Sequence, residues 1–97
     1  MQLRIIILLA GLFWAVGASG QTTRVRGQVT DAADGKPLQF VSVVFPGTTI
    51  GITTDEQGIY ALETRDTVSR VQASMVGYAT LTRPVTPGVF NHVDFAL

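Results

Sequence analysis

From Thr22 onward, apolar and polar side chains alternate along the chain with a period of two residues. In the first such stretch, Val25, Gly27 and Val29 alternate with arginine and glutamine side chains. Successive side chains of a β-strand point to opposite faces, so this pattern predicts strands with one buried and one exposed face. β-Branched residues and glycines interrupt every window that could hold a helical period. The alternation therefore predicts an all-β chain from this point to the C-terminus.

Turn residues interrupt the alternation at roughly 8–12-residue spacing, which is typical of a β-sandwich or small barrel. They separate seven predicted strands, at about residues 24–29, 41–45, 48–54, 59–63, 68–75, 79–83 and 92–97. In one of these turns, Asp55 and Gly58 fit the first and fourth positions of a type I turn. Elsewhere glycine supplies a positive φ and proline stops strand pairing. Residues 21–97 are therefore predicted to form one all-β domain of seven strands.

The first 20 residues have a different composition and are predicted to be an export signal. Arg4 supplies a positive charge ahead of an apolar run, and small residues follow that run. Ala18 and Gly20 fit cleavage after residue 20, and a cut two residues earlier fits as well. The apolar run is shorter than the roughly 20 residues that cross a bilayer. We therefore expect residues 1–20 to be a signal peptide and the exported domain to contain no transmembrane span.

The chain contains no cysteine, and its seven basic and seven acidic residues balance. Without cysteine there are no disulfide bonds, no thiolate catalysis and no Cys-ligated zinc. The balanced charge excludes a strongly basic nucleic-acid-binding protein. A domain of fewer than about 80 residues rarely gains more than about 3–5 kcal/mol from its hydrophobic core. We therefore expect a small domain that evolved as an attachment to something larger.

Six short motifs follow one another in a fixed order. They are Val25-Arg-Gly27-Gln-Val29-Thr-Asp31, Gly35-Lys-Pro37-Leu38, Val41-Ser-Val43-Val-Phe45, Gly47-Thr48, Gly51-Ile-Thr53-Thr54-Asp55-Glu-Gln-Gly58-Ile-Tyr60-Ala-Leu62 and Ser74-Met-Val-Gly77-Tyr78. In this order they resemble the carboxypeptidase-regulatory-like domain, a transthyretin-related, seven-stranded Greek-key β-sandwich. Each motif is common on its own, but their order and spacing together are specific. The resemblance extends over nearly all of residues 24–97.

The resemblance implies an extracytoplasmic, non-catalytic accessory role beside a larger unit. Such domains often stand at the N-terminus of exported proteins from Bacteroidetes-type bacteria, including TonB-dependent outer-membrane receptors of the starch-utilisation type. We therefore expect an exported module, in the periplasm, at the outer membrane or secreted, that positions or docks a larger envelope protein. A stand-alone module and an N-terminal fragment of a TonB-dependent receptor are both open. A carbohydrate- or peptide-binding sandwich is the second hypothesis, and a peptide can bind by adding a strand to a sheet edge.

Seven residues of these motifs are predicted to shape turns and strands: Gly27, Asp31, Gly35, Asp55, Gly58, Gly77 and Tyr78. Gly27 lies in mid-strand, where a side chain would obstruct a neighbouring backbone or a bulge. Gly35 and Gly58 permit turn geometries that a Cβ would strain. Asp55 can accept hydrogen bonds from the backbone of its own turn. Tyr78 is expected to bury its ring and to donate its hydroxyl proton to a carbonyl.

The sequence offers no complete catalytic or metal-binding motif. His92, the only histidine, shares a strand face with Asp94, but no nucleophile motif or third ligand accompanies them. Four acidic residues could be considered as calcium ligands: Asp31, Asp34, Asp55 and Glu56. Their spacing does not match an EF-hand loop, and no glycine-rich phosphate loop precedes a helix. We therefore expect no catalytic residue, no cofactor and no metal site.

The second predicted strand is apolar on both faces. Val41, Val43 and Phe45 share one face, and Phe40 and Val44 lie on the other. Such a strand is either covered on both sides or displays an apolar patch. We hypothesise that Phe40 and Val44 contribute to a docking surface for another domain or subunit. The alternative is that a neighbouring loop covers them.

Overall fold

The computed structural model describes residues 21–97 of the chain. Within this range it contains eight β-strands and no helix: β1 (Thr23–Thr30), β2 (Ser42–Val44), β3 (Gly51–Thr53), β4 (Ile59–Thr64), β5 (Arg70–Ser74), β6 (Leu81–Pro84), β7 (Phe90–His92) and β8 (Phe95–Ala96). No helix that could span a membrane occurs in this part of the chain. The predicted signal peptide lies outside the described residues.

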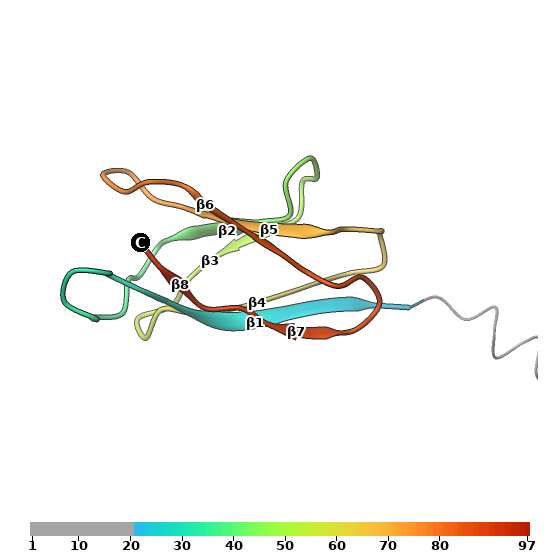
Figure 1. Ribbon diagram of the computed structural model, residues 1–97, viewed down its shortest axis with the longest axis horizontal. Coiled ribbons are helices and arrows are strands. Elements are labelled where there is room, and N and C mark those ends of the chain that lie inside the picture. The colour runs from blue at the N-terminus through green and yellow to red at the C-terminus, as the bar shows by residue number, and fades with distance from the viewer. Residues whose placement is uncertain (1–20) are drawn as a thin grey trace, which may run out of the picture.

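The strands form two sheets that face each other as the layers of a sandwich (Figure 1). In the first sheet, β1 is central and pairs with β4 on one side and with β7 and β8 on the other. The second sheet is antiparallel throughout, in the order β3-β2-β5-β6. Polar and apolar residues alternate along β1, and the apolar ones are buried. The predicted all-β sandwich is therefore confirmed.

The last predicted strand is divided into β7 and β8, which gives eight strands where the sequence predicts seven. Both pieces pair with β1 in parallel, with Arg26 beside His92 and Val29 beside Phe95. Val29 comes three positions after Arg26, and Phe95 comes three positions after His92, so the two pieces keep the same register with β1. The C-terminal strand is therefore interrupted at residues 93–94 without an inserted residue.

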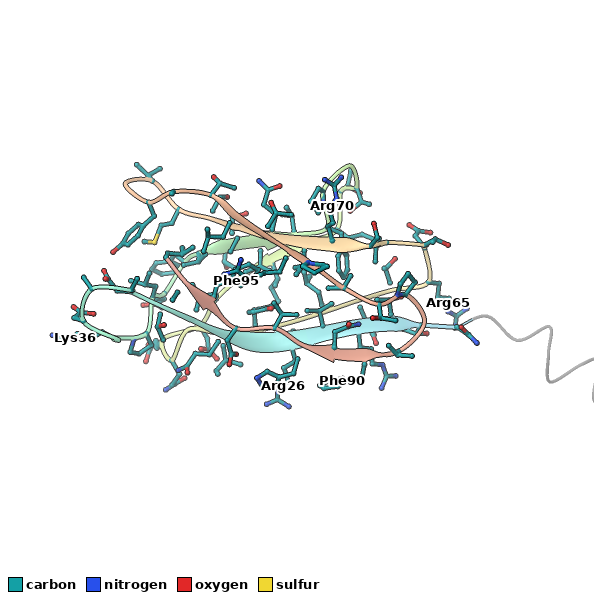
Figure 2. The ribbon with its side chains drawn as sticks, viewed as in Figure 1. Arg26, Lys36, Arg65, Arg70, Phe90 and Phe95 are labelled. Carbon is teal, nitrogen blue, oxygen red and sulfur yellow. The ribbon has the colours of Figure 1, made fainter. Side chains whose placement is uncertain are left out.

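The core lies between the two sheets and contains twelve buried apolar residues. They are Val25, Val29, Val41, Val43, Phe45, Tyr60, Leu62, Val68, Val71, Ala73, Val85 and Phe95. The ring centroids of Tyr60 and Phe95 are 6.1 Å apart, with the ring planes inclined by 47°, a common arrangement of aromatic pairs. Phe95 points between the layers, whereas Phe90 lies on the outside of the first sheet (Figure 2).

Candidate functional site

The interruption of the C-terminal strand is centred on the backbone of Val93. Gly27 of β1 lies beside it, between the inward-facing positions of Val25 and Val29. The carbonyl oxygen of Val93 occupies the space that a Cβ at Gly27 would need. Glycine at this position therefore allows a backbone carbonyl to lie on the core side of the sheet.

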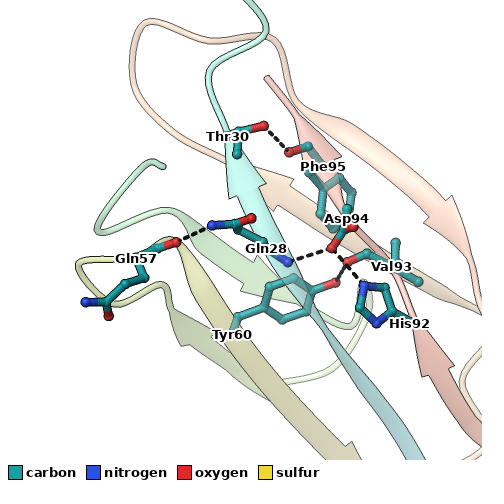
Figure 3. A network of polar contacts seen from close by, with 8 residues as sticks. All are labelled: Gln28, Thr30, Gln57, Tyr60, His92, Val93, Asp94 and Phe95. Atoms are coloured by element: carbon teal, nitrogen blue, oxygen red, sulfur yellow. Dashed lines mark hydrogen bonds and ion pairs between the residues drawn. The ribbon is translucent and has the colours of Figure 1, made fainter. Parts of the chain in front are cut away.

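A buried tyrosine hydroxyl satisfies this carbonyl. Tyr60 of β4 pairs with Gly27 across the sheet, and its hydroxyl donates a hydrogen bond to the carbonyl oxygen of Val93 (Figure 3). Burial, and secondarily the negative charge of Asp94, raises the pKa of Tyr60. The hydroxyl therefore remains protonated and keeps its role as donor.

The side chain of Asp94 takes the place of the Val93 carbonyl as a hydrogen-bond acceptor for β1, because that carbonyl points to Tyr60 instead. In an uninterrupted parallel ladder, the N–H of Gln28 would donate to Val93. It donates instead to Oδ1 of Asp94, over 2.8 Å. The same oxygen lies 3.1 Å from Nε2 of His92, and both of these side chains are largely exposed (Figure 3). The only His–Asp pair in the described region thus lies on the surface, and its carboxylate holds a strand in register.

Three of the four acidic residues considered as calcium ligands, Asp31, Asp34 and Asp55, bind the backbone of their own turns. Oδ1 of Asp31 accepts the N–H of Ala33, and Oδ1 of Asp34 accepts the N–H of Lys36. Asp55 accepts two N–H groups, from Gln57 and Ile59, each over 2.9 Å, and its own carbonyl accepts the N–H of Gly58, whose φ is 74°. Residues 21–97 bring no three His, Asp or Glu side chains together in a way that could hold a metal ion.

Tyr78 connects the two sheets through a carboxylate. It follows Gly77, which has a φ of 91°, in the turn between β5 and β6. Its hydroxyl donates a 2.7 Å hydrogen bond to Oδ2 of Asp31, in the loop after β1. The prediction of a buried ring whose hydroxyl binds a carbonyl is wrong, because the ring is only half-buried and the acceptor is a side chain.

Removal of the Tyr78 hydroxyl is expected to raise the pKa of Asp31. This hydroxyl, and after it the N–H of Ala33, holds that pKa below its usual value of 3.8, and the Asp31 acceptor raises the pKa of Tyr78. The stabilisation from Asp31 is therefore present above pH 3.8 and is lost as the pH falls through its lower folded-state pKa. The stabilisation from Tyr78 depends on pH in the opposite direction: it is present at low pH and is lost as the pH rises through the raised pKa of Tyr78.

An NMR titration of the Asp31 carboxyl carbon tests this prediction in the wild type and in Tyr78→Phe. The matched control is Val76→Ala, a change in the same turn at a side chain that is almost entirely exposed. An Asp31 titration midpoint that is unchanged by Tyr78→Phe would contradict the assignment.

Phe40 lies just before β2 rather than in it. It is 69% exposed and, at 65°, is the only non-glycine residue with a positive φ in the described part of the chain. Hydrogen bonds of the buried Thr54 hold the segment. The carbonyl oxygen of Thr54 accepts a hydrogen bond from the N–H of Phe40. Its hydroxyl donates to the carbonyl oxygen of Leu38 and accepts from the N–H of Val41. A strained backbone thus presents an aromatic ring to solvent.

Phe40 and Val44 are placed differently from each other. Phe40 borders a shallow hollow together with Ser42, Ser74, Met75 and Val76; we call these five residues the Phe40 surface. Val44 is half-buried in β2 and borders a separate hollow over the turn between β2 and β3. Ser42 borders both hollows. No neighbouring loop in the described part of the chain covers Phe40, which is exposed. The side chain of Val44, by contrast, packs over Gly51, in the space that a Cβ at Gly51 would occupy.

Sequence reasoning missed two residues that shape these features, Tyr60 and Thr54. The glycine in the middle of β1 was the available signal for Tyr60, but finding its partner requires the pairing of β1 with β4. Thr54 gave no signal, because a threonine in a β-rich stretch is expected to be an ordinary strand residue.

The geometry defines a small β-sandwich domain whose polar side chains secure turns, a strand interruption and the contact between sheets. Residues 25–95 match the family model of the CarboxypepD_reg-like domain. The chain therefore belongs to the CarboxypepD_reg-like domain family, which confirms the resemblance noted from its motifs.

Two curated relatives are similar to most of this chain. One is TonB-dependent receptor P3 of Formosa agariphila, which is 30% identical over 79 residues, or 81% of this chain. The other is TonB-dependent receptor SusC of Bacteroides thetaiotaomicron, which is 33% identical over 81 residues, or 84% of this chain. The matched region makes up 8% of the length of each relative.

A similar solved structure is 3-chlorocatechol 1,2-dioxygenase from Rhodococcus opacus 1CP. It has 21% sequence identity and a TM-score of 0.48, and the match covers 69% of this chain and 44% of the dioxygenase chain. A likeness at this level carries no argument about function.

Proposed function

We propose that this chain is a non-catalytic, exported module that positions or docks a larger envelope protein of the TonB-dependent receptor type. The observation that carries the proposal is the strained and exposed Phe40. The family membership and the two receptor relatives supply the class of partner.

Phe40 has a left-handed backbone conformation, and its ring lies in solvent instead of in the core of the domain. A left-handed backbone costs a residue with a Cβ about 1–2 kcal/mol, and Thr54 holds Phe40 in that state. Burial of a phenylalanine side chain against a partner would contribute about 1.5–3 kcal/mol. Val76, which is 99% exposed, and Met75 lie on the same surface. Covering by another protein would therefore stabilise the Phe40 surface further.

The polar side chains support a non-catalytic role. The carboxylates of Asp31, Asp34 and Asp55 accept backbone N–H groups of their own turns, and Asp94 accepts the N–H of Gln28. Each of these groups already has a structural task. The relatives are receptors by name, and in them the matched region is a small part of a much longer chain. Both facts favour an accessory role beside a larger unit.

Glycan or peptide binding is the alternative, and Phe90 is the residue that favours it. Phe90 is 61% exposed and borders an open hollow on the first sheet with Arg24, Arg26 and Glu63. A single ring flanked by charged side chains is a smaller platform than the aromatic rows that stack on sugars. Phe90 is therefore a matched control for Phe40, since both phenylalanines are exposed and Phe90 lies on the first sheet, whereas Phe40 lies beside the second.

Phe40→Asp is expected to reduce recovery of the larger envelope protein by about 30-fold, because a central aromatic anchor commonly contributes about 2 kcal/mol to binding. The measurement is quantitative co-purification from the bacterium that makes the protein. A photo-crosslinking amino acid at position 40 identifies the protein that covers the ring, and we expect a receptor of the TonB-dependent class.

Phe90→Asp, the control, should leave recovery unchanged. Equal recovery from Phe40→Asp and the wild type would refute docking through the Phe40 surface. Glycan or peptide binding that is lost in Phe90→Asp and kept in Phe40→Asp would favour the alternative.

A further inference from the structure

The outer strands of the two sheets are protected against edge-to-edge pairing, with one exception. On β4, Asp55 binds both the N–H and the C=O of Ile59, and Glu63 adds a charge. On β6, Arg83 adds a charge and Pro84 has no N–H. β7 and β8 are separated from each other at the Val93 interruption. Charges, prolines and broken strands are means by which proteins prevent their edges from pairing.

The exception is β3, whose three residues are all exposed. It belongs to the segment of residues 48–54, which contains no charge and no proline. All of these residues except Gly51 are threonine or isoleucine, which favour extended strands. Ile52 at the centre is 44% exposed. β3 is therefore the edge with the chemistry of a pairing strand.

The backbone groups of β3 that face outward can be read from its pairing with β2. The N–H of Phe45 donates to the carbonyl oxygen of Ile50, and the N–H of Thr54 donates to the carbonyl oxygen of Val41. Hydrogen-bonded and non-hydrogen-bonded pairs alternate in an antiparallel ladder, so Ile52 also bonds to β2. Gly51 and Thr53 therefore direct their N–H and C=O groups away from the sheet, toward solvent.

We propose that β3 pairs with β3 of a second copy of this chain, antiparallel, about a two-fold axis through Ile52. In this register Gly51 of each copy lies opposite Thr53 of the other, and the outward N–H and C=O groups form reciprocal hydrogen bonds. The two Ile52 side chains lie side by side on the inner face and cover each other's exposed surface. The pairing extends the four-stranded sheet through both copies.

Charge also favours a second copy as the occupant. The nearest charged residues on the chain are Asp55 and Glu56, beyond the end of β3. The residues before β3, from Thr48 to Ile50, are uncharged, so the antiparallel arrangement keeps the acidic residues of the two copies at opposite ends of the paired strands. Three-residue strands bury less than the roughly 1,200 Å² of the smallest stable interfaces, so the association is weak and depends on protein concentration.

Two measurements on the protein purified from cells that express the full chain test this inference. In sedimentation equilibrium, the weight-average mass should rise toward that of a dimer with increasing concentration. Thr53→Lys should keep the protein monomeric over the same range, because a charge on an edge opposes pairing. Thr82→Lys places the same charge on the outer face of β6, at the opposite edge of this sheet, and should still dimerise.

Amide exchange gives a readout that needs no variant. The N–H groups of Gly51 and Thr53 should exchange several-fold more slowly at high protein concentration, while those of Ala61 and Glu63 on β4 should not change. A mass that stays monomeric at every concentration would overturn the proposal. Association that survives Thr53→Lys, association that is lost equally in Thr82→Lys, or unchanged exchange at Gly51 and Thr53 would overturn it as well.

Discussion

Gly27→Ala is expected to destabilise the domain by about 3–5 kcal/mol, because it combines overpacking with the loss of a buried hydrogen bond. The new methyl group would overlap the carbonyl of Val93. To relieve that overlap the carbonyl must move, and it then leaves the hydroxyl of Tyr60 without its acceptor. A small domain without disulfides has about this much stability in total. About half of the variant should therefore be unfolded at 25 °C.

Urea unfolding followed by circular dichroism measures this effect. Gly35→Ala is the matched control, since Gly35 has a φ of 73° but no atom within 4 Å of the position that a Cβ would take. It should cost only the conformational strain of a left-handed residue, about 1–2 kcal/mol. Equal midpoints for the two variants would show that the carbonyl of Val93 does not depend on the absence of a side chain at Gly27.

Phe95→Ala is the second substitution with a large expected effect, a loss of about 3–5 kcal/mol of stability. Phe95 lies on the short strand β8 and is 1% exposed, with its ring against Tyr60. Truncation removes the apolar surface of the ring from the core. It also leaves a cavity beside the hydroxyl that holds Val93.

Phe90→Ala is the control for Phe95→Ala, because Phe90 lies on the other piece of the same interrupted strand and is 61% exposed. Its stability should change by about 0.5 kcal/mol or less, as is usual for exposed positions. The same urea unfolding experiment compares the two. If Phe95→Ala were as stable as Phe90→Ala, β8 would not be part of the core.

Much of the fold follows from local sequence patterns. The alternation of Val25 and Val29 with polar residues predicts β1 and its buried face, and the pattern from residue 59 predicts β4 in the same way. The candidate site was predicted less completely. The sequence leads to the hypothesis that Phe40 contributes to a docking surface, which stays a prediction, but it does not predict the position of Phe40 outside β2 or its left-handed backbone. Pairing with Thr54, fourteen residues further along the chain, imposes them.

The sequence by itself determined the strand faces, the turns and the family, because side-chain alternation and turn chemistry are properties of neighbouring residues. Only the tertiary structure decided that Val93 interrupts the last strand, that Tyr78 meets Asp31 and that β3 is the unprotected edge. Each of these depends on which strands lie side by side and in which register. Local periodicity does not encode that choice, since a strand with one apolar face can pair with several partners, and the packing of the two sheets selects among them.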